Sequence, residues 1–360
     1  MLYASLTLST ALHLEAGPEA TLRLADYYTS DPNARGPEFL GWYPDFGSLR
    51  EHAPSVQVLA HGELWKLSSI WPDAAYYVRQ VEHPEQSIAP YKYRVLPTAL
   101  VRAIKGVTSL SVEASFVLLN TLAAILTALL FEVLLRREFG LTPLGAALGG
   151  CLCVAAVSNT STLLFPMLEP TSALCSVLVF LAVSRRNALG FVLAAIAGVA
   201  TKEILVFASA LWLLHRAPSE PWGRCLLVAA LPLLAFAGIR VAYGGSALEV
   251  NYGFDVLHGQ FPGYGKRLLG LRSLSGLLVQ TFMAFSFTWL GLVNIPQHPF
   301  LRRSWPVIPL VVLAAFLLSG RITRVLGVLF PIVVPAFLLF FRPERPEHTE
   351  RPERTAQEAT

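Results

Sequence analysis

Charged side chains are scarce in this sequence of 360 residues. They make up 14 % of it, against about a quarter in an average soluble domain. They are also unevenly placed, because residues 111–341 hold only 23 of the 52 Asp, Glu, Lys and Arg residues. The apolar runs between these charges are long enough to matter in lipid, where about 20 residues cross the hydrocarbon core. The composition therefore argues against an ordinary soluble domain and indicates a membrane protein.

Several functional signatures are missing as well. The basic residues behind the formal charge of +4 flank apolar segments instead of clustering with aromatic residues, which argues against a nucleic-acid partner. The four cysteines lie in apolar segments, and we interpret them as small buried hydrophobic residues. Cys151 and Cys153 have the wrong spacing for a zinc site and no His beside them. The sequence also lacks the nucleophile, P-loop and dinucleotide-binding motifs of soluble enzymes.

The apolar runs divide the chain into four parts. Residues 1–14 are interpreted as a short or truncated first span, although an uncleaved signal or a start site inside a longer helix also fits them. Residues 15–110 are predicted to be a large extracytoplasmic loop with amphipathic helices near the membrane surface. Residues 111–341 form the predicted transmembrane domain. Residues 342–360 are charged and free of large apolar groups, which predicts a disordered cytoplasmic tail.

The fold predicted from these runs is an all-α polytopic membrane protein with roughly nine or ten transmembrane helices. Two of the runs, 188–201 and 203–215, are short. They predict either a hairpin of half-length helices that meet at Lys202 and Glu203 or one long tilted helix. Within the loop, Leu96, Leu100 and Ile104 recur at the spacing of an amphipathic helix. The spans are predicted at residues 111–135, 141–158, 167–184, 188–201, 203–215, 225–243, 274–294, 305–320 and 324–341.

The placement of basic residues predicts the topology. Basic residues accumulate in cytoplasmic loops. Threading the predicted spans puts the pairs Arg136-Arg137, Arg185-Arg186 and Arg302-Arg303 on one side, which we expect to face the cytoplasm. The same threading gathers a second set of polar residues on the opposite side: Asp73, Arg94, Glu169, Lys202, Arg240, Lys266, Arg267, Arg321 and Arg324. Basic residues kept in a short outer loop, such as Arg321 and Arg324, are best explained by an anionic ligand.

Some of these outer residues suit a particular chemistry. Asp73 lies among aromatic residues, where desolvation would raise the pKa of its carboxyl towards the range of a general base. Arg and Lys side chains bind phosphate, so Arg94, Lys202, Arg321 and Arg324 could together hold a lipid phosphate. Simpler interpretations stay open. Asp73 could cap a surface helix, and Arg94 could extend to the interface from an amphipathic one.

Glu169 and Lys202-Glu203 lie inside or between apolar runs. Charge in a membrane segment is costly, so such residues are functional hypotheses by default. For Glu169 the simpler interpretation is a carboxylate at a helix N-terminus that faces the aqueous boundary. For Lys202-Glu203 it is the wet tip of a hairpin.

Three short motifs carry a resemblance to a known class. Asp73 precedes Tyr76 and, after a spacer, the stretch Tyr91-Lys92-Tyr93-Arg94-Val95-Leu96-Pro97. Thr201-Lys202-Glu203 stands between two short apolar runs. A late loop with Arg321 and Arg324 leads into an apolar helix with Phe330-Pro331 and Pro335. In this layout, residues 70–341 resemble bacterial polytopic glycosyltransferases of the GT-C class.

The resemblance implies an activity and roles for residues. Such enzymes take a sugar from a polyprenyl-phosphate donor and attach it to an acceptor outside the cytoplasm, using an acid in the first external loop. That role falls on Asp73, with Arg94, Lys202, Arg321 and Arg324 as phosphate-binding residues and Tyr76, Glu169 and Glu203 as supporting ones. The implied partners are a lipid-linked sugar donor and membrane lipids. No tightly bound cofactor is implied, although a divalent metal beside a carboxylate is compatible with this chemistry.

The sequence also departs from that class. About 58 residues separate Leu14 from Asp73, whereas the acid should follow the first span closely. Asp26 is nearer that span and is the alternative catalytic acid. Where relatives often carry Asp before Pro in a later outer loop, this chain has Glu169-Pro170.

Two other functions compete with a transferase. A transporter or flippase of an amphipathic anion is one, because transporters place their sites at broken helices such as 188–215. The lack of a sequence repeat and the gathering of charges at one surface argue against it. A non-catalytic membrane protein is the other, and the unusual N-terminal region favours it.

Overall fold

The structure, a computed structural model, describes residues 77–78, 80–87, 91–157, 167–244, 278, 281–282, 284–318 and 325–342. The regular structure of these residues is helical, with no strand among them, which confirms the predicted helical class. The segments 1–14 and 343–360 lie outside the described residues, as do five of the predicted site residues: Asp26, Asp73, Tyr76, Arg321 and Arg324.

Each predicted apolar run that the structure describes contains a helix. The run expected at 274–294 differs most, because its described residues before Ser286 are α-helical and those from Ser286 form a 3-10 helix that ends only at Gln297. In chain order the elements are η2 (Pro84–Gln86), η3 (Tyr91–Tyr93), α7 (Val95–Val107), α8 (Val112–Glu138), α9 (Pro143–Val157), α11 (Glu169–Ser184), α12 (Ala188–Thr201), η4 (Glu203–Phe207), α13 (Ala208–Arg216), α14 (Trp222–Ala242), η5 (Ser286–Gln297), α17 (Pro299–Ser304), α18 (Val307–Leu318), η6 (Gly327–Leu329), α20 (Phe330–Leu338) and η7 (Leu339–Phe341).

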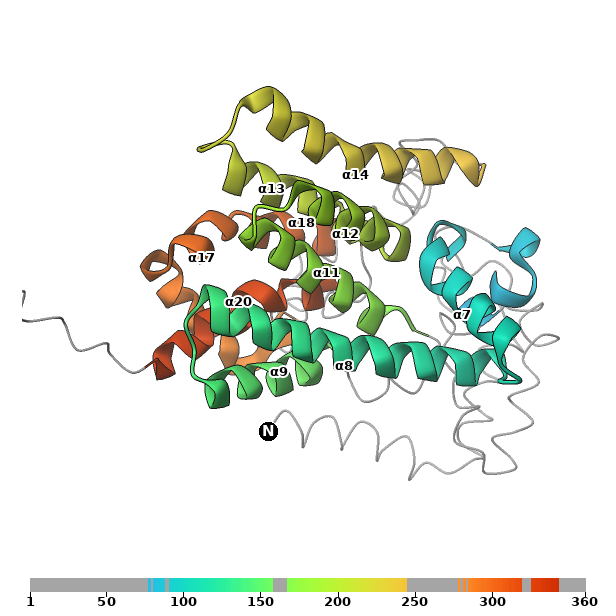
Figure 1. Ribbon diagram of the computed structural model, residues 1–360, viewed down its shortest axis with the longest axis horizontal. Coiled ribbons are helices and arrows are strands. Elements are labelled where there is room, and N and C mark those ends of the chain that lie inside the picture. The colour runs from blue at the N-terminus through green and yellow to red at the C-terminus, as the bar shows by residue number, and fades with distance from the viewer. Residues whose placement is uncertain are drawn as a thin grey trace, which may run out of the picture.

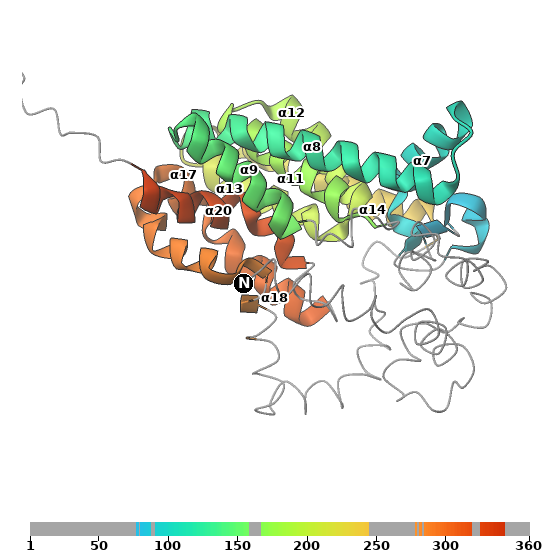
Figure 2. The same ribbon diagram turned by 90° about the horizontal axis from the view of Figure 1, so that it is seen from below.

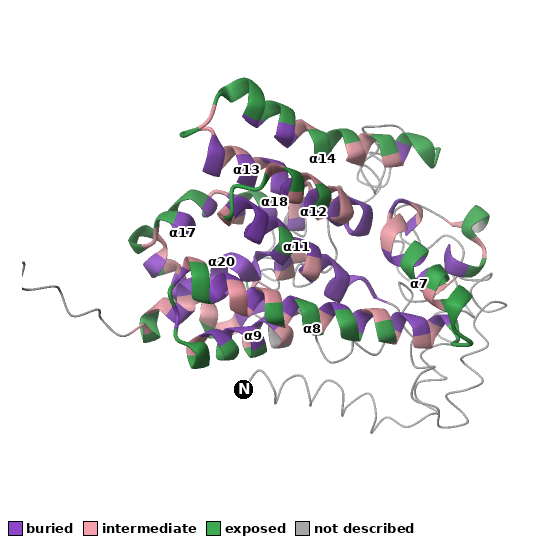
Figure 3. Ribbon diagram, in the orientation of Figure 1, coloured by how far each residue is buried: buried purple, intermediate pink, exposed green. Residues whose placement is uncertain are grey.

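Helix α11 is the centre of the bundle. It packs between α8 and α12, and 13 of its 16 residues are buried (Figures 1 and 3). The C-terminal helices α17, α18 and α20 lie below α8 and α12 in the view of Figure 2. Aromatic rings join these two parts, since the Phe131 and Phe330 ring centroids are 5.0 Å apart. The core therefore runs along α11 and continues into α20.

Helices α12 and α13 form a hairpin. Lys202 has an extended backbone, with φ −156° and ψ 126°, which ends α12 before η4 begins. The chain turns back after Lys202, and the Phe191 ring near the start of α12 lies 4.6 Å from the Trp212 ring in the middle of α13. Of the two arrangements that the sequence allows, the structure has the hairpin, with Lys202 and Glu203 at its tip.

The outward faces of the longest helices are apolar. Helices α8 and α14 are the two described helices that are long and apolar enough to cross a membrane, and 28 % of the most apolar stretch of each is buried. The core helix of a soluble protein would be mostly buried instead. Ile125 on α8 and Leu234 on α14 are 52 % and 65 % exposed, whereas Ser115 and Thr127 of α8 are buried. Apolar residues outside and small polar residues inside are what a lipid environment favours.

The other apolar helices are shorter. Helices α9, α11 and α12 have 15, 16 and 14 residues, fewer than the roughly 20 that cross the hydrocarbon core without help from adjoining turns. The predicted number of spans therefore stays a prediction.

Helix α7 and the segment before it pack against the start of α8. The helix predicted from Leu96, Leu100 and Ile104 is present, with Val101 buried against the protein and Leu100 exposed. Arg102 donates from Nε to the Val81 carbonyl at 3.1 Å and so fixes the preceding turn on α7.

The prediction for the cysteines is partly wrong. Cys153, Cys175 and Cys225 are buried, but Cys151 is exposed. Cys151 lies on the outward face of α9, beside positions such as Leu148 that are exposed as well. An apolar segment in a membrane protein has apolar residues on both faces, so composition could not separate the buried cysteines from the exposed one.

The exposed apolar faces of α8 and α14 lead to a first prediction. We expect Ile125→Lys and Leu234→Lys, each near the middle of its helix, to lower the membrane-integrated fraction several-fold. The reason is that a lysine at a helix centre costs roughly 3 kcal/mol on insertion. Carbonate extraction of membranes measures this fraction. Gly223→Lys at the exposed start of α14 is the control and should behave as wild type; recovery of all three variants without detergent would contradict the account.

Gly140 supports a second prediction, because it follows α8 with φ +63°. A side chain in this left-handed conformation costs roughly 1–2 kcal/mol. We expect Gly140→Ala to lower the free energy of unfolding by about 1 kcal/mol. Gly238→Ala in α14, where a Cβ would meet nothing within 4 Å, is the matched control and should be neutral or stabilising. Thermal unfolding in detergent would compare the two; an equal response in both would show that the turn is not strained.

Candidate functional site

Two ion pairs, one buried and one partly buried, meet at one end of the bundle. Lys202 Nζ lies 3.3 Å from Glu169 Oε1, and Arg94 Nε lies 3.2 Å from Glu203 Oε2. Lys202 and Glu203 are consecutive, so the two pairs are neighbours at the tip of the α12–α13 hairpin. The start of α7, the start of α11 and this tip therefore converge on one charged cluster.

Local structure places each carboxylate and each cation. Glu169 is the first residue of α11 and is followed by Pro170, a residue favoured at helix starts. Its Oε2 accepts from the Leu168 N–H at 3.2 Å. Lys202 is held by the hairpin turn, where its N–H donates to the Gly198 carbonyl at 2.8 Å and its own carbonyl accepts from the Leu205 N–H at 3.0 Å.

Aromatic side chains surround Arg94. Its Nη1 donates to the hydroxyl of Tyr77, and its guanidinium carbon lies 5.5 Å from the centre of the Tyr91 ring. The Tyr77 and Tyr91 rings pack edge to face with centroids 5.3 Å apart, and both are buried. Cation–π contact and hydrogen bonding together fix the guanidinium against Glu203.

Arg240 belongs to the same region. It lies near the end of α14, is 2 % exposed and stands over the rings of Tyr93 and Phe236 at 4.8 Å and 4.3 Å. The sequence placed Arg240 on the same side as Arg94 but did not include it among the site residues. The sequence does carry a signal that could have included Arg240, because it is a lone basic residue near the end of an apolar helix.

The burial of the cluster decides between the interpretations left open by the sequence. Lys202 and Glu169 are 7 % and 5 % exposed, so neither a wet hairpin tip nor a carboxylate at the aqueous boundary describes them. Arg94 pairs with Glu203 instead of reaching the interface, with 12 % of its side chain exposed. Burying four charges is costly unless each is paired, and the observed pairing meets that condition.

The arginine pairs lie at the opposite end. Glu169 begins α11 and Arg185-Arg186 follow its last residue. At that far end, Ser184 donates to a Glu138 carboxylate oxygen and His298 Nε2 lies 3.1 Å from the Glu138 carbonyl. Burial lowers the pKa of His298, so its ring is neutral at pH 7. The cluster at Glu169 and the pair Arg185-Arg186 therefore lie at opposite ends of α11, as the threading of the predicted spans leads one to expect.

The structure thus unites Arg94, Lys202, Glu169 and Glu203, all four of the predicted site residues that it describes. Among the described residues, no group of three His, Cys, Asp or Glu side chains is arranged to hold a metal ion. Comparison with known proteins adds no relative: no protein-family model, curated protein or solved structure matches the chain. The function must therefore be argued from the cluster itself.

The ion pair of Lys202 and Glu169 leads to a third prediction, which concerns the coupling of their contributions to stability. Removing one partner of a buried pair costs roughly 3–5 kcal/mol, whereas replacing both by apolar or neutral groups of similar size is often nearly neutral. We expect Glu169→Gln alone to lower the free energy of unfolding by about 3 kcal/mol and Glu169→Gln with Lys202→Met to cost much less than the sum of the single changes.

The exposed pair Glu132 and Arg136, 3.6 Å apart on α8, is the matched control. Its double-mutant cycle should give a coupling below about 0.5 kcal/mol. Unfolding followed in a denaturing detergent measures both cycles. Additive effects of Glu169→Gln and Lys202→Met would mean that their pairing does not stabilise the fold.

Proposed function

We propose that this chain is a polytopic membrane glycosyltransferase that moves a sugar from a polyprenyl-phosphate donor to an extracytoplasmic acceptor. The observation that carries the proposal is the buried cluster in which Arg94 and Lys202 meet Glu203 and Glu169. Two residues proposed to bind phosphate, 108 positions apart in the chain, converge there. The cluster lies at the end of α11 away from the arginine pairs, which is the end that the positive-inside preference assigns to the outside.

The paired carboxylates suit a site for a charged substrate. Buried Arg and Lys side chains need a counter-ion before the donor arrives, and Glu203 and Glu169 supply it. A donor phosphate would exchange with these carboxylates as the partner of Arg94 and Lys202. The tyrosines around Arg94 add apolar surface with hydroxyl groups, which suits a sugar or the first units of a lipid tail.

Chain connectivity favours Asp73 as the catalytic acid over Asp26. Asp73 precedes Tyr77 by four residues, and four residues of chain span at most about 14 Å. Asp73 is therefore within reach of the cluster that contains the Tyr77 hydroxyl, whereas 50 residues separate Asp26 from Tyr77. Arg324 lies four residues before Val328, whose carbonyl accepts from Ser176 in the middle of α11 at 3.1 Å, so the same bound limits only its distance from that part of α11.

The reaction proposed is a direct displacement. The Asp73 carboxylate takes the proton of the acceptor hydroxyl, and the oxygen attacks the anomeric carbon of the sugar. The bond from that carbon to the donor phosphate oxygen breaks, and the phosphate leaves with the bonding electrons. Arg94 and Lys202 stabilise the charge that develops on the leaving oxygen, and the sugar configuration is inverted.

The membrane arrangement that goes with this reaction is the one expected from the sequence. Roughly nine or ten helices cross a bacterial inner membrane, with the cluster facing outside and the arginine pairs facing the cytoplasm. The exposed apolar faces of α8 and α14 support insertion. The separation of basic pairs from the cluster supports the orientation.

A transporter of an amphipathic anion is the second candidate, favoured by the break at Lys202 in the α12–α13 hairpin. Transporter sites usually lie near the bilayer midplane. Here the break lies at the end of the bundle where α11 begins, which fits surface chemistry better.

The fourth prediction tests the transferase directly. We expect the purified, reconstituted protein to transfer or hydrolyse label from one member of a panel of radiolabelled polyprenyl-phosphate sugars. Asp73→Asn should abolish transfer while donor binding is retained, and Lys202→Met should weaken donor binding at least tenfold. Asp26→Asn is the control and should keep activity.

Other outcomes would change the conclusion in distinct ways. If activity is lost in Asp26→Asn but kept in Asp73→Asn, Asp26 is the general base instead of Asp73. Donor flux across sealed vesicles without transfer would favour the transporter. If the protein neither binds nor turns over any donor, the transferase and the transporter are both contradicted.

A further inference from the structure

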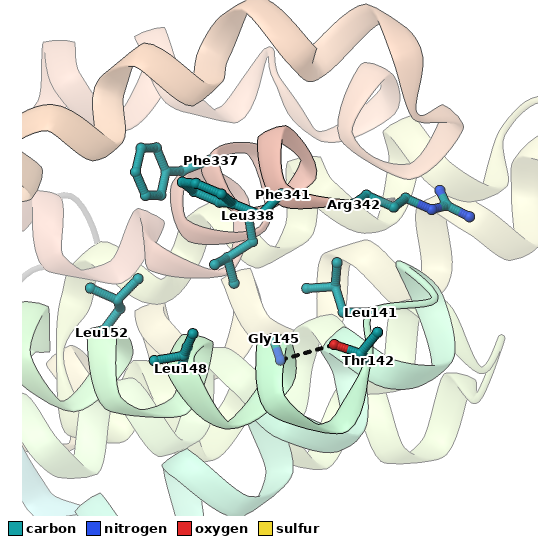
Figure 4. Close-up of a pocket in the computed structure, with 9 residues that line it drawn as sticks. All are labelled: Leu141, Thr142, Gly145, Leu148, Leu152, Phe337, Leu338, Phe341 and Arg342. Carbon is teal, nitrogen blue, oxygen red and sulfur yellow. Dashed lines mark hydrogen bonds between the residues drawn. The ribbon is translucent and has the colours of Figure 1, made fainter. Parts of the chain in front are cut away.

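A pocket lies at the other end of the bundle from the charged cluster. It has a volume of about 240 Å³ and is formed by α9 on one side and by α20 with η7 on the other (Figure 4). Leu148 and Leu152 of α9 face Phe337 and Leu338 of α20 across it. We call it the α9–α20 groove.

Two glycines on α9 show why the groove is open. At Gly149 a Cβ would lie 2.8 Å from Leu338 Cδ1, so the two helices touch there. At Gly145, one turn earlier, a Cβ would meet only Thr142 and Leu141, with no atom of α20 within 4 Å. The helices therefore diverge from Gly149 towards Gly145. Leu148 and Phe341 are 53 % and 69 % exposed, so the groove opens on the outer surface of the bundle.

One cation lies at the mouth of this apolar groove. Arg342 lines the end next to the α8–α9 turn, where its Nη2 is 3.4 Å from the position of a Cβ on Gly140. Among the residues that the structure describes, no carboxylate forms an ion pair with Arg342. The turn also belongs to the end of α8 that carries Arg136 and Arg137.

We propose that the α9–α20 groove binds one acyl chain of an anionic phospholipid, with the lipid phosphate on Arg342. This proposal rests on the membrane insertion included in the proposed function but not on sugar transfer. The apolar walls match a hydrocarbon chain, and a single basic residue at the mouth complements a phosphate. The position agrees with the leaflet that holds the arginine pairs, since cytoplasmic leaflets are rich in anionic lipids.

The test uses the full chain purified in detergent and mixed with dioleoylphosphatidylglycerol, with bound lipid counted by native mass spectrometry. We expect wild type to retain one tightly bound lipid. Arg342→Gln should weaken retention at least fivefold, and Gly145→Leu should remove it by filling the groove. Arg137→Gln, an exposed arginine of the same end that does not line the groove, is the control and should retain lipid as wild type does.

Several results would overturn the proposal. Equal lipid retention in all four proteins would show that the groove is not the site. If dioleoylphosphatidylcholine is retained equally well, the anionic charge of the lipid does not contribute to binding. If inorganic phosphate alone displaces the lipid, the acyl chain does not contribute. A doubled mass that disappears in Gly145→Leu would show that a second copy fills the groove. Thermal unfolding confirms that each variant is folded, and carbonate extraction tests membrane insertion separately, so a failure of either proposal can be told apart.

Discussion

The pairing of Lys202 with Glu169 and of Glu203 with Arg94 is the constraint on which the arrangement of this protein depends. A charge is costly to remove from water unless it is paired, and each of these four charges, buried or partly buried, is paired with a partner from another element. The pairs tie the hairpin tip to the starts of α7 and α11. The extended backbone at Lys202 ends α12 and places both consecutive residues at the tip of the hairpin, where these partners lie.

The distribution of apolar residues gives the same molecule its second constraint. Helices α8 and α14 both expose leucine on their outer faces, and α8 buries Ser115, Asn120 and Thr127 inside. Exposed apolar faces of this kind suit a lipid environment better than water. The charged cluster, by contrast, is enclosed by the bundle itself.

Much of the fold and of the candidate site could be predicted from the sequence, where the signal comes from residues that are neighbours in the chain. Charged residues between two apolar runs gave a hairpin that meets at Lys202-Glu203 as one of two alternatives, and Glu169 before Pro170 suited the start of a helix. The partner of Arg94 could not be predicted, because 109 residues separate it from Glu203 and only the packing of α7 on the hairpin brings them together. The exposure of Cys151 was missed because the outward positions of α9, such as Leu148, are as apolar as its buried ones.

The most direct test of the central claim is to find where a polyprenyl phosphate binds. A polyprenyl phosphate with a photoreactive group beside its phosphate, cross-linked to the reconstituted protein, would report the contacted residues by peptide mass spectrometry. The account predicts adducts in the peptides that contain Arg94 and Lys202, reduced when Lys202 is changed to Met. Adducts confined to the end that carries Arg136 and Arg302 would contradict it.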